Sequence, residues 1–291
     1  MFFMVGLMVI CAAPQLKAES SDKEIKQIEL AAEQGDADAQ YLLASMYEES
    51  SIVPQDFQKA AYWYTKAAEQ GDAGAQIKLA TIYYEGKGVH KDDQKAIYWH
   101  TKAAEQGDAV AQFGLALRYY AGEGVSQDTK KGFSWLTKAA EQGRAMAQVI
   151  LALMYKNGEG VTRDYQQAIY WYTTAAEQGN ADAQYNLASM YGKGEGLPRD
   201  LIKAAHWCTK AAEQGVVDAQ FTLALMFYEG KGVAQNNTYS YVWNSIAANS
   251  GDTQAAKNRD HVAKSLSSQQ LVYAQKLIDE IQHKIDVNRE N

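Results

Sequence analysis

Cysteine is nearly absent from this chain of 291 residues, which contains only Cys11 and Cys208. Cys11 lies within an apolar run at the N-terminus, so the folded part keeps one thiol and forms no internal disulfide. Basic residues are outnumbered as well, at 28 against 35 acidic ones, and they form no stripe along the sequence. We therefore expect no nucleic acid and no anionic lipid among the partners.

Long apolar segments are missing beyond residue 18, so we expect no stable membrane span in the rest of the chain. The run Phe2–Ala13, of about 12 apolar residues, is too short to cross a bilayer but is typical of a signal-peptide core. We assign residues 1–18 to a signal peptide cleaved after Ala18 and predict a periplasmic or secreted protein. The alternatives are a retained anchor and a buried helix of the fold.

Clusters of catalytic or metal-binding residues are missing too. The five histidines share no zinc-like spacing on one helix face. His206 and Cys208 are two residues apart, so they point to different sides of a helix. Asn236 begins a glycosylation sequon, but its place in the repeat is better explained as a helix cap. We expect no enzyme activity, no bound metal and no cofactor.

What the chain does have is a motif that recurs every 36 residues without insertion or deletion. The sequence Ala-Ala-Glu-Gln-Gly begins at Ala31, Ala67, Ala103, Ala139, Ala175 and Ala211, with a degenerate copy at Ala247. All six tryptophans share one position in the period, namely Trp63, Trp99, Trp135, Trp171, Trp207 and Trp243. A fixed period of this length is typical of a solenoid. We predict an all-α, right-handed α/α superhelix with six complete two-helix repeats over residues 37–252.

One period, residues 72–107, illustrates the predicted unit. Asp72 caps a first helix over residues 73–84, and Asp92 caps a second helix that ends near residue 105. The glycines between the two helices should have positive φ, which we predict for Gly88 and for its equivalent Gly160. The tryptophan of the second helix should be buried between adjacent repeats, and we expect Trp135→Ala to cost on the order of 3–5 kcal/mol.

Both ends of the array deviate from the period. Residues 19–36 form half a repeat, in which Ser21 and Glu24 make a capping box, and we assign them to an N-terminal capping helix. After the sixth repeat, Arg259 and Asp260 replace the apolar Leu and Ala of the first helix. We assign residues 253–291 to C-terminal capping helices, the last of which opens near Ser267.

The repeated pattern resembles the Sel1-like repeats, which are short α/α repeats related to tetratricopeptide repeats. The pattern runs Ala-Gln-x-x-Leu-Ala-x-x-Tyr, Gly-x-Gly-Val-x-x-Asp and Lys-Ala-x-x-Trp-x-Thr-Lys-Ala-Ala-Glu-Gln-Gly, and it covers roughly residues 31–256. The resemblance implies a non-enzymatic scaffold or adaptor of the bacterial envelope, or a secreted one, that binds a protein or peptide. The alternatives are an envelope enzyme and an inhibitor of a cell-wall enzyme. The β-lactam activity of the cysteine-rich branch is not carried over, because the repeat cysteines are missing.

Variation within the first helices falls on one face of the helix. In the two central repeats this face is apolar, whereas the equivalent positions in other repeats are mainly polar. We predict that it forms the centre of a peptide-binding groove on the concave side, made of Val110, Gly114, Leu117, Met146, Ile150 and Leu153. Gly114 would leave room for a ligand side chain. The alternative is that these side chains only fill gaps between helices.

Overall fold

The computed structural model describes residues 23–49 and 53–290, and every regular element within these ranges is a helix. The first helix covers residues 23–33. The others are α2 (Ala37–Glu49), α3 (Phe57–Glu69), α4 (Ala73–Glu85), α5 (Asp93–Glu105), α6 (Ala109–Ala121), α7 (Thr129–Glu141), α8 (Ala145–Asn157), α9 (Tyr165–Glu177), α10 (Ala181–Lys193), α11 (Leu201–Glu213), α12 (Val217–Glu229), α13 (Asn237–Asn249), α14 (Thr253–Ala263) and α15 (Ser268–Glu290). The predicted signal peptide, residues 1–18, and Ser21 of the predicted capping box lie outside the described residues.

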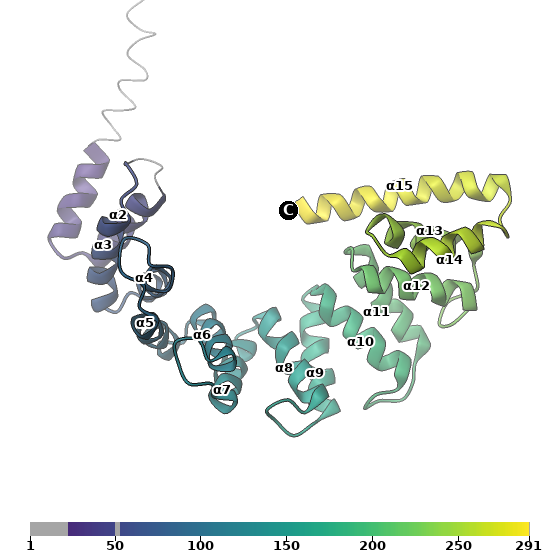
Figure 1. Cartoon of the computed structure of the whole chain (residues 1–291), viewed down its shortest axis with the longest axis horizontal. Helices are drawn as coiled ribbons and strands as arrows, with labels where there is room; N and C mark the ends of the chain where they lie inside the picture. Colours follow the sequence, from purple (N-terminus) through teal and green to yellow (C-terminus); the bar gives the residue numbers. More distant parts are fainter. Residues whose placement is uncertain (1–22, 50–52, 291) are drawn as a thin grey trace, which may run out of the picture. The chain divides into compact units, whose positions relative to one another are not determined.

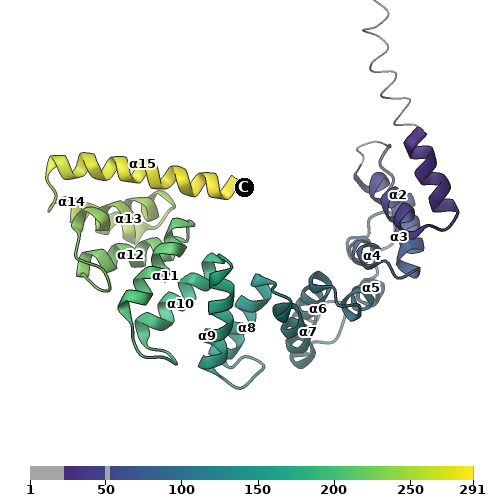
Figure 2. The ribbon, with the colours of Figure 1, turned by 180° about the vertical axis from the view of Figure 1, so that it is seen from behind.

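The chain forms two compact units, residues 1–139 and 140–291, with the boundary inside α7. Within each unit, neighbouring helices in the sequence pack side by side as helix pairs, which the ribbon traces in order (Figures 1 and 2). The predicted all-α solenoid of tandem two-helix repeats is confirmed.

Most of the helices begin where the sequence provides a cap, although the N-cap residues of α8 and α12 make no side-chain cap hydrogen bond. The Asp92 side chain accepts a hydrogen bond from the backbone N–H of Lys95 at 3.0 Å, and Asp72 caps α4 in the same way through Ala75. Asn236 accepts from the backbone N–H of Tyr239 at 3.1 Å, so it caps α13 as predicted. Both helices of the example period are confirmed to within a residue or two of their predicted ends.

Two glycines in the turn after α4 have positive φ. The C-cap Gly86 has φ 71°, and Gly88, which follows two residues later, has φ 70°. Gly160 has φ 73°, so the predictions for Gly88 and Gly160 are confirmed. A Cβ on Gly88 would overlap the backbone carbonyl of Phe57, at the start of α3. Only glycine fits here, because the turn both reverses the chain and rests on the previous second helix.

Small side chains let the helices approach closely. In the first unit Ala103, Ala104, Ala111 and Leu115 form a fully buried cluster between α5 and α6. Because three of these four side chains are single methyl groups, the two backbones are held at a short distance.

The tryptophans are less buried than predicted. Only Trp171 and Trp243 are buried, with 8% and 4% of their surface exposed, whereas Trp135 is half-buried. Trp135 packs against the cluster between α5 and α6, and the ammonium group of Lys138 lies 4.2 Å from its ring centre. The buried stripe of the second helix runs instead through the next residue, as at His100 beside Trp99. The prediction of a buried Trp135 is therefore wrong, and we expect the cost of removing its ring to lie below the predicted range.

A relay of buried glutamines ties the second helices together. In α4 the Gln76 side chain donates to the backbone carbonyl of Ala68, at the end of α3, at 3.1 Å. The same side chain accepts from Nε2 of Gln106, at the end of α5, at 2.9 Å. The same bond, from Nε2 of the later glutamine to Oε1 of the earlier one, recurs at 2.7–3.0 Å in three other pairs. These are Gln40 and Gln70, Gln148 and Gln178, and Gln184 and Gln214. The two glutamines that recur in the sequence are thus two parts of one bridge.

The relay ends in the sixth repeat. Gln220 donates to the carbonyl of Ala212 at 3.2 Å, but its buried Oε1 has no hydrogen-bond partner among the described residues. The partner position, 30 residues further on, carries Ser250 instead of glutamine. The serine side chain is too short to reach, so one acceptor stays unsatisfied.

We expect Ser250→Gln to raise the free energy of unfolding by about 1 kcal/mol, because it supplies the missing Nε2 donor to Gln220. Ser250→Glu is the matched control, since it has the same length but no donor. Urea titrations of the three proteins measure the effect. Equal stability of the Gln and Glu variants would show that the bond does not form.

The C-terminal helices end the array. Arg259 is half-buried and Asp260 exposed on α14, at positions that bury Leu and Ala in earlier repeats. Helix α15 does not continue the stacking but lies along α13 in both views (Figures 1 and 2), with Ala274, Ile278 and Ile285 buried. A reciprocal pair of hydrogen bonds between Ser267 and Gln270 starts this helix.

Candidate functional site

The six predicted binding residues lie on two first helices. Val110 and Leu117 on α6 are 48% and 41% exposed. Met146 and Leu153 on α8 are 47% and 39% exposed, and Ile150 between them is half-buried. Helix α6 belongs to the first unit and α8 to the second, so the six residues are treated as two separate apolar surfaces, one on each helix.

One side of Gly114 contacts another helix of the protein. A Cβ on Gly114 would lie 3.6 Å from Nε2 of His100, which reaches it from α5. The sequence predicted room for a ligand side chain at this point. The imidazole of His100 borders this space on one side, and the exposed large apolar side chains of α6 are Val110 and Leu117.

His100 is an uncharged base inside the first unit. Only 8% of it is exposed, and its Nδ1 atom has no hydrogen-bond partner within the described residues. Burial, aided by the positive charge of Arg118, lowers the pKa of His100 from 6.5 to about 4. Arg118 lies over the ring of Tyr84, 4.2 Å from its centre, so guanidinium, phenol and imidazole fill this part of the unit together.

We expect His100 to make the fold sensitive to acid. The unfolded chain takes up the proton near pH 6.5 and the folded chain only near pH 4. This contribution to stability is fully present above pH 6.5, where the imidazole is neutral in both states. The free energy of unfolding then falls by about 3 kcal/mol as the pH falls from 6.5 towards 4. His100→Leu, which places there the residue found at the equivalent position 136, should lose less stability over that range. Denaturant titrations at pH 7, 5.5 and 4 test this, and a parallel loss in both proteins would contradict it.

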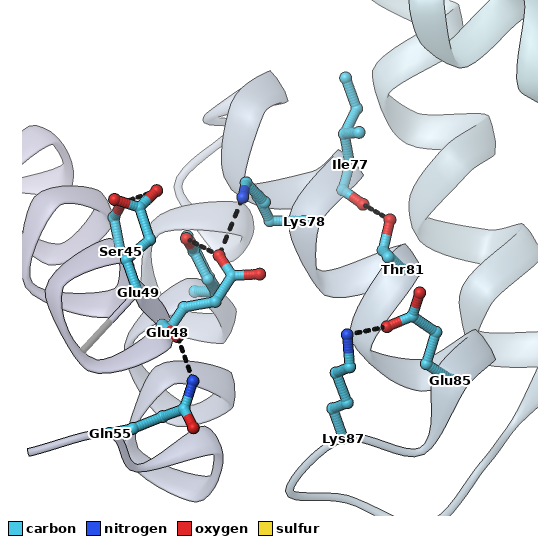
Figure 3. A network of polar contacts seen from close by, with 10 residues as sticks. Ser45, Glu48, Glu49, Gln55, Ile77, Lys78, Thr81, Glu85 and Lys87 are labelled. Atoms are coloured by element: carbon cyan, nitrogen blue, oxygen red, sulfur yellow. Dashed lines mark hydrogen bonds and ion pairs between the residues drawn. The ribbon is translucent and has the colours of Figure 1, made fainter. Parts of the chain in front are cut away.

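The first repeat fills the equivalent space with a polar network (Figure 3). The Glu48 carboxylate accepts a hydrogen bond from the hydroxyl of Tyr64 at 2.7 Å and one from the ammonium group of Lys78 at 2.9 Å. Burial, together with Glu48, raises the pKa of Tyr64 well above its usual range. Burial alone would lower the pKa of Lys78, but the hydrogen bond and charge of Glu48 outweigh it and raise that pKa. The network joins α2, α3 and α4 through side chains from each of the three helices.

In the first repeat a hydrogen bond joins residues 48 and 64, and we call these two positions, in every repeat, the filler pair. One lies near the end of the first helix and is occupied by Glu48, Tyr84, Tyr120, Lys156, Gly192 or Tyr228. The other lies in the middle of the second helix and is occupied by Tyr64, His100, Leu136, Tyr172, Cys208 or Asn244. The sequence prediction considered variation within the first helix only and so missed the pair. Aligning the second helices at the 36-residue period would have revealed it.

The described residues offer no assembly for metal chemistry. Within residues 23–49 and 53–290, no three side chains of His, Cys, Asp and Glu come together in a way that could hold a metal ion. Among the helices of these same ranges, none has the length and apolar character of a membrane span.

The repeats match a known family. The family model described as Sel1 repeat matches residues 37–72, 73–108, 109–143, 145–180, 181–216 and 217–252. A Sel1 repeat protein from Oxalobacter formigenes is similar in structure, with 30% identity, a TM-score of 0.62, and coverage of 78% of this chain and 99% of that one. A protective antigen of uropathogenic Escherichia coli with an SLR fold is 30% identical over 90% of this chain and 72% of its own, with a TM-score of 0.38. The immunity protein Pa5087 from Pseudomonas aeruginosa is 25% identical over 73% of this chain and 81% of its own, with a TM-score of 0.40. No curated protein matches the chain.

Proposed function

Because this chain belongs to the Sel1 repeat family, whose members are generally non-catalytic scaffolds for protein interaction, we propose that it binds a protein or peptide partner through its first helices. The binding surfaces are the apolar surface of α6, around Val110 and Leu117, and that of α8, around Met146 and Leu153.

The observation that carries the proposal is the exposure of large apolar side chains on these helices. Val110, Leu117, Met146 and Leu153 each leave between 39% and 48% of their surface in water. The repeat fold does not require them, since the equivalent positions elsewhere carry residues such as Asp182. Fully burying an exposed side chain of this kind contributes about 1.5–3 kcal/mol. These four have less than half of their surface left to bury, so together they contribute about 3–5 kcal/mol before association costs, and further contacts must supply the rest of the affinity.

Mutation of each surface tests the proposal. We expect Leu117→Asp and Leu153→Asp to stay folded, because both side chains are already partly in water, and to lose a partner captured from cell-envelope extract by the unmodified chain. Ile202→Asp is the matched control, since it places the same charge on an exposed aliphatic residue of a second helix, α11. Capture with mass spectrometry and circular dichroism provide the two measurements. Partner capture that survives both first-helix changes would place binding elsewhere.

We further propose that the protein acts in the periplasm or outside the cell. The support is the apolar run Phe2–Ala13, followed by Pro14 and a polar segment. If residues 1–18 are a signal peptide, the chain purified from the periplasm or medium should begin at Glu19. N-terminal sequencing measures this directly, and an intact Met1 on the exported protein would favour a retained anchor.

A further inference from the structure

The second unit contains a cavity of about 290 Å³ between α10, α11 and α12. Its floor is apolar and buried, whereas the two lysines at its edge are exposed. The side chains around it are Tyr185, Ala188, Ser189, Gly192, Lys193, Leu201, Ala204, Cys208, Thr222, Met226 and Lys231. The cavity is therefore a pocket with an apolar interior and a polar mouth, which is the usual form of a ligand site.

The cavity exists because both members of the filler pair are small in this repeat. Gly192 lies within α10 and has no side chain, and a Cβ there would meet only the Cβ of Ala204, at 3.8 Å. Cys208 stands where two other repeats have tyrosine. The thiol donates a hydrogen bond to the carbonyl of Ala219 at 3.2 Å, and burial raises the pKa of the thiol to about 12. The floor of the cavity at this point is therefore a small, uncharged side chain.

The next repeat shows what normally fills this space. There the filler pair is Tyr228 and Asn244, and the equivalent cavity shrinks to about 90 Å³. The third repeat, in the first unit, also packs a tyrosine ring of its first helix on its second helix. There the ring of Tyr120 on α6 lies 3.1 Å from the position that a Cβ of Gly132 on α7 would take. A tyrosine ring on the first helix is thus the ordinary occupant of the space that Gly192 leaves open.

We propose that this cavity binds an aromatic side chain of a partner peptide, with an acidic residue of the same peptide next to it. The inference rests on the proposed function and adds the chemistry of the ligand. The aromatic ring would restore the packing that Tyr228 provides in its own repeat. The hydroxyls of Ser189 and Thr222, which line the cavity, are suitable partners for a phenol or indole group.

The acidic residue is assigned from the charge at the mouth. The residues around the cavity include two lysines and neither Asp nor Glu. Lys231 pairs closely with Glu229, at 2.7 Å. Lys193 lies 3.9 Å from Glu195 with 63% of its side chain exposed, so its ammonium group is open to a carboxylate from a ligand.

The test fills the cavity with the residue that other repeats use. Gly192→Tyr should fold, because tyrosine stands at this position in three other repeats and the nearest atom to its Cβ is at an ordinary contact distance. His206→Tyr is the matched control, since it adds the same side chain to an exposed position of α11 where three other repeats also have tyrosine. Circular dichroism and urea titration check that both variants are folded.

Two ligands serve as probes. The first is a phage-displayed library of random 12-residue peptides, selected on the unmodified full chain. We expect the enriched peptides to share one aromatic residue beside Asp or Glu, and to bind Gly192→Tyr at least about tenfold more weakly than His206→Tyr. The second is 4-methylphenol, the side chain of tyrosine, which should perturb the NMR signals of Ala188 and Ala204 with a dissociation constant on the order of millimolar, and not in Gly192→Tyr.

The outcomes separate the two proposals. Failure to enrich any peptide, with no partner from extract, would overturn the proposed function and this inference together. In a second outcome, the peptides lose binding to Leu117→Asp or Leu153→Asp but bind Gly192→Tyr and the unmodified chain equally tightly. That result would agree with the proposed function and would overturn the proposal that the cavity binds the aromatic residue. A dimer that Gly192→Tyr dissociates in analytical ultracentrifugation would identify a second copy of this chain as the occupant and overturn the assignment of a partner peptide.

Discussion

A buried glutamine on the first helix determines how one repeat sits on the next. Its amide donates to the end of the preceding second helix and accepts from the end of its own, as Gln76 does between Ala68 and Gln106. Each amide lies in an alanine-lined interior, where an unpaired polar group costs about 1–3 kcal/mol. A slip of one residue between helices would break both bonds, so the relay holds the helices in register while the alanines permit their close approach. The turns then need glycine at two positions, because the closely packed backbone leaves no space for a Cβ such as that of residue 88.

This constraint divides the positions of a repeat into two kinds. Some positions hold the backbone arrangement and hardly change along the chain. They are the glutamines, the buried Leu and Ala, the Asp that caps the second helix and the turn glycines. The filler pair and the exposed face of the first helix lie outside the relay and can change without disturbing it. Within this one protein, the first position of the filler pair carries a polar side chain in Glu48, an aromatic ring in Tyr228 and no side chain in Gly192. Differences between repeats therefore concentrate outside the relay, at the filler pair and on the exposed face of the first helix.

The sequence was sufficient to predict the helices, their caps and the positive φ of the glycines, since each depends on residues that are neighbours in the chain. It was less informative about the degree of burial. Trp135 shares its position with the buried Trp171, yet it is only half-buried, because the surrounding packing and not the position alone sets its exposure. The sequence also does not reveal that His100 borders Gly114, because this histidine lies 14 residues earlier on another helix. The filler pair joins residues 16 apart, such as Gly192 and Cys208, and only the packing of three helices relates them to one space.

Gly192 is a costly residue for its position. Glycine in a helix interior is about 1 kcal/mol less favourable than alanine, and Gly192, in the last turn of α10, carries part of this cost. It also leaves a cavity that a tyrosine would reduce. The glycines at 194 and 196 have positive φ and are required by the turn, whereas Gly192 lies in the helix with ordinary φ and is not. A residue that weakens its own helix without serving the backbone is expected where function outweighs stability. Cys208 leaves the same space open from the second helix, so both filler positions of the fifth repeat are small.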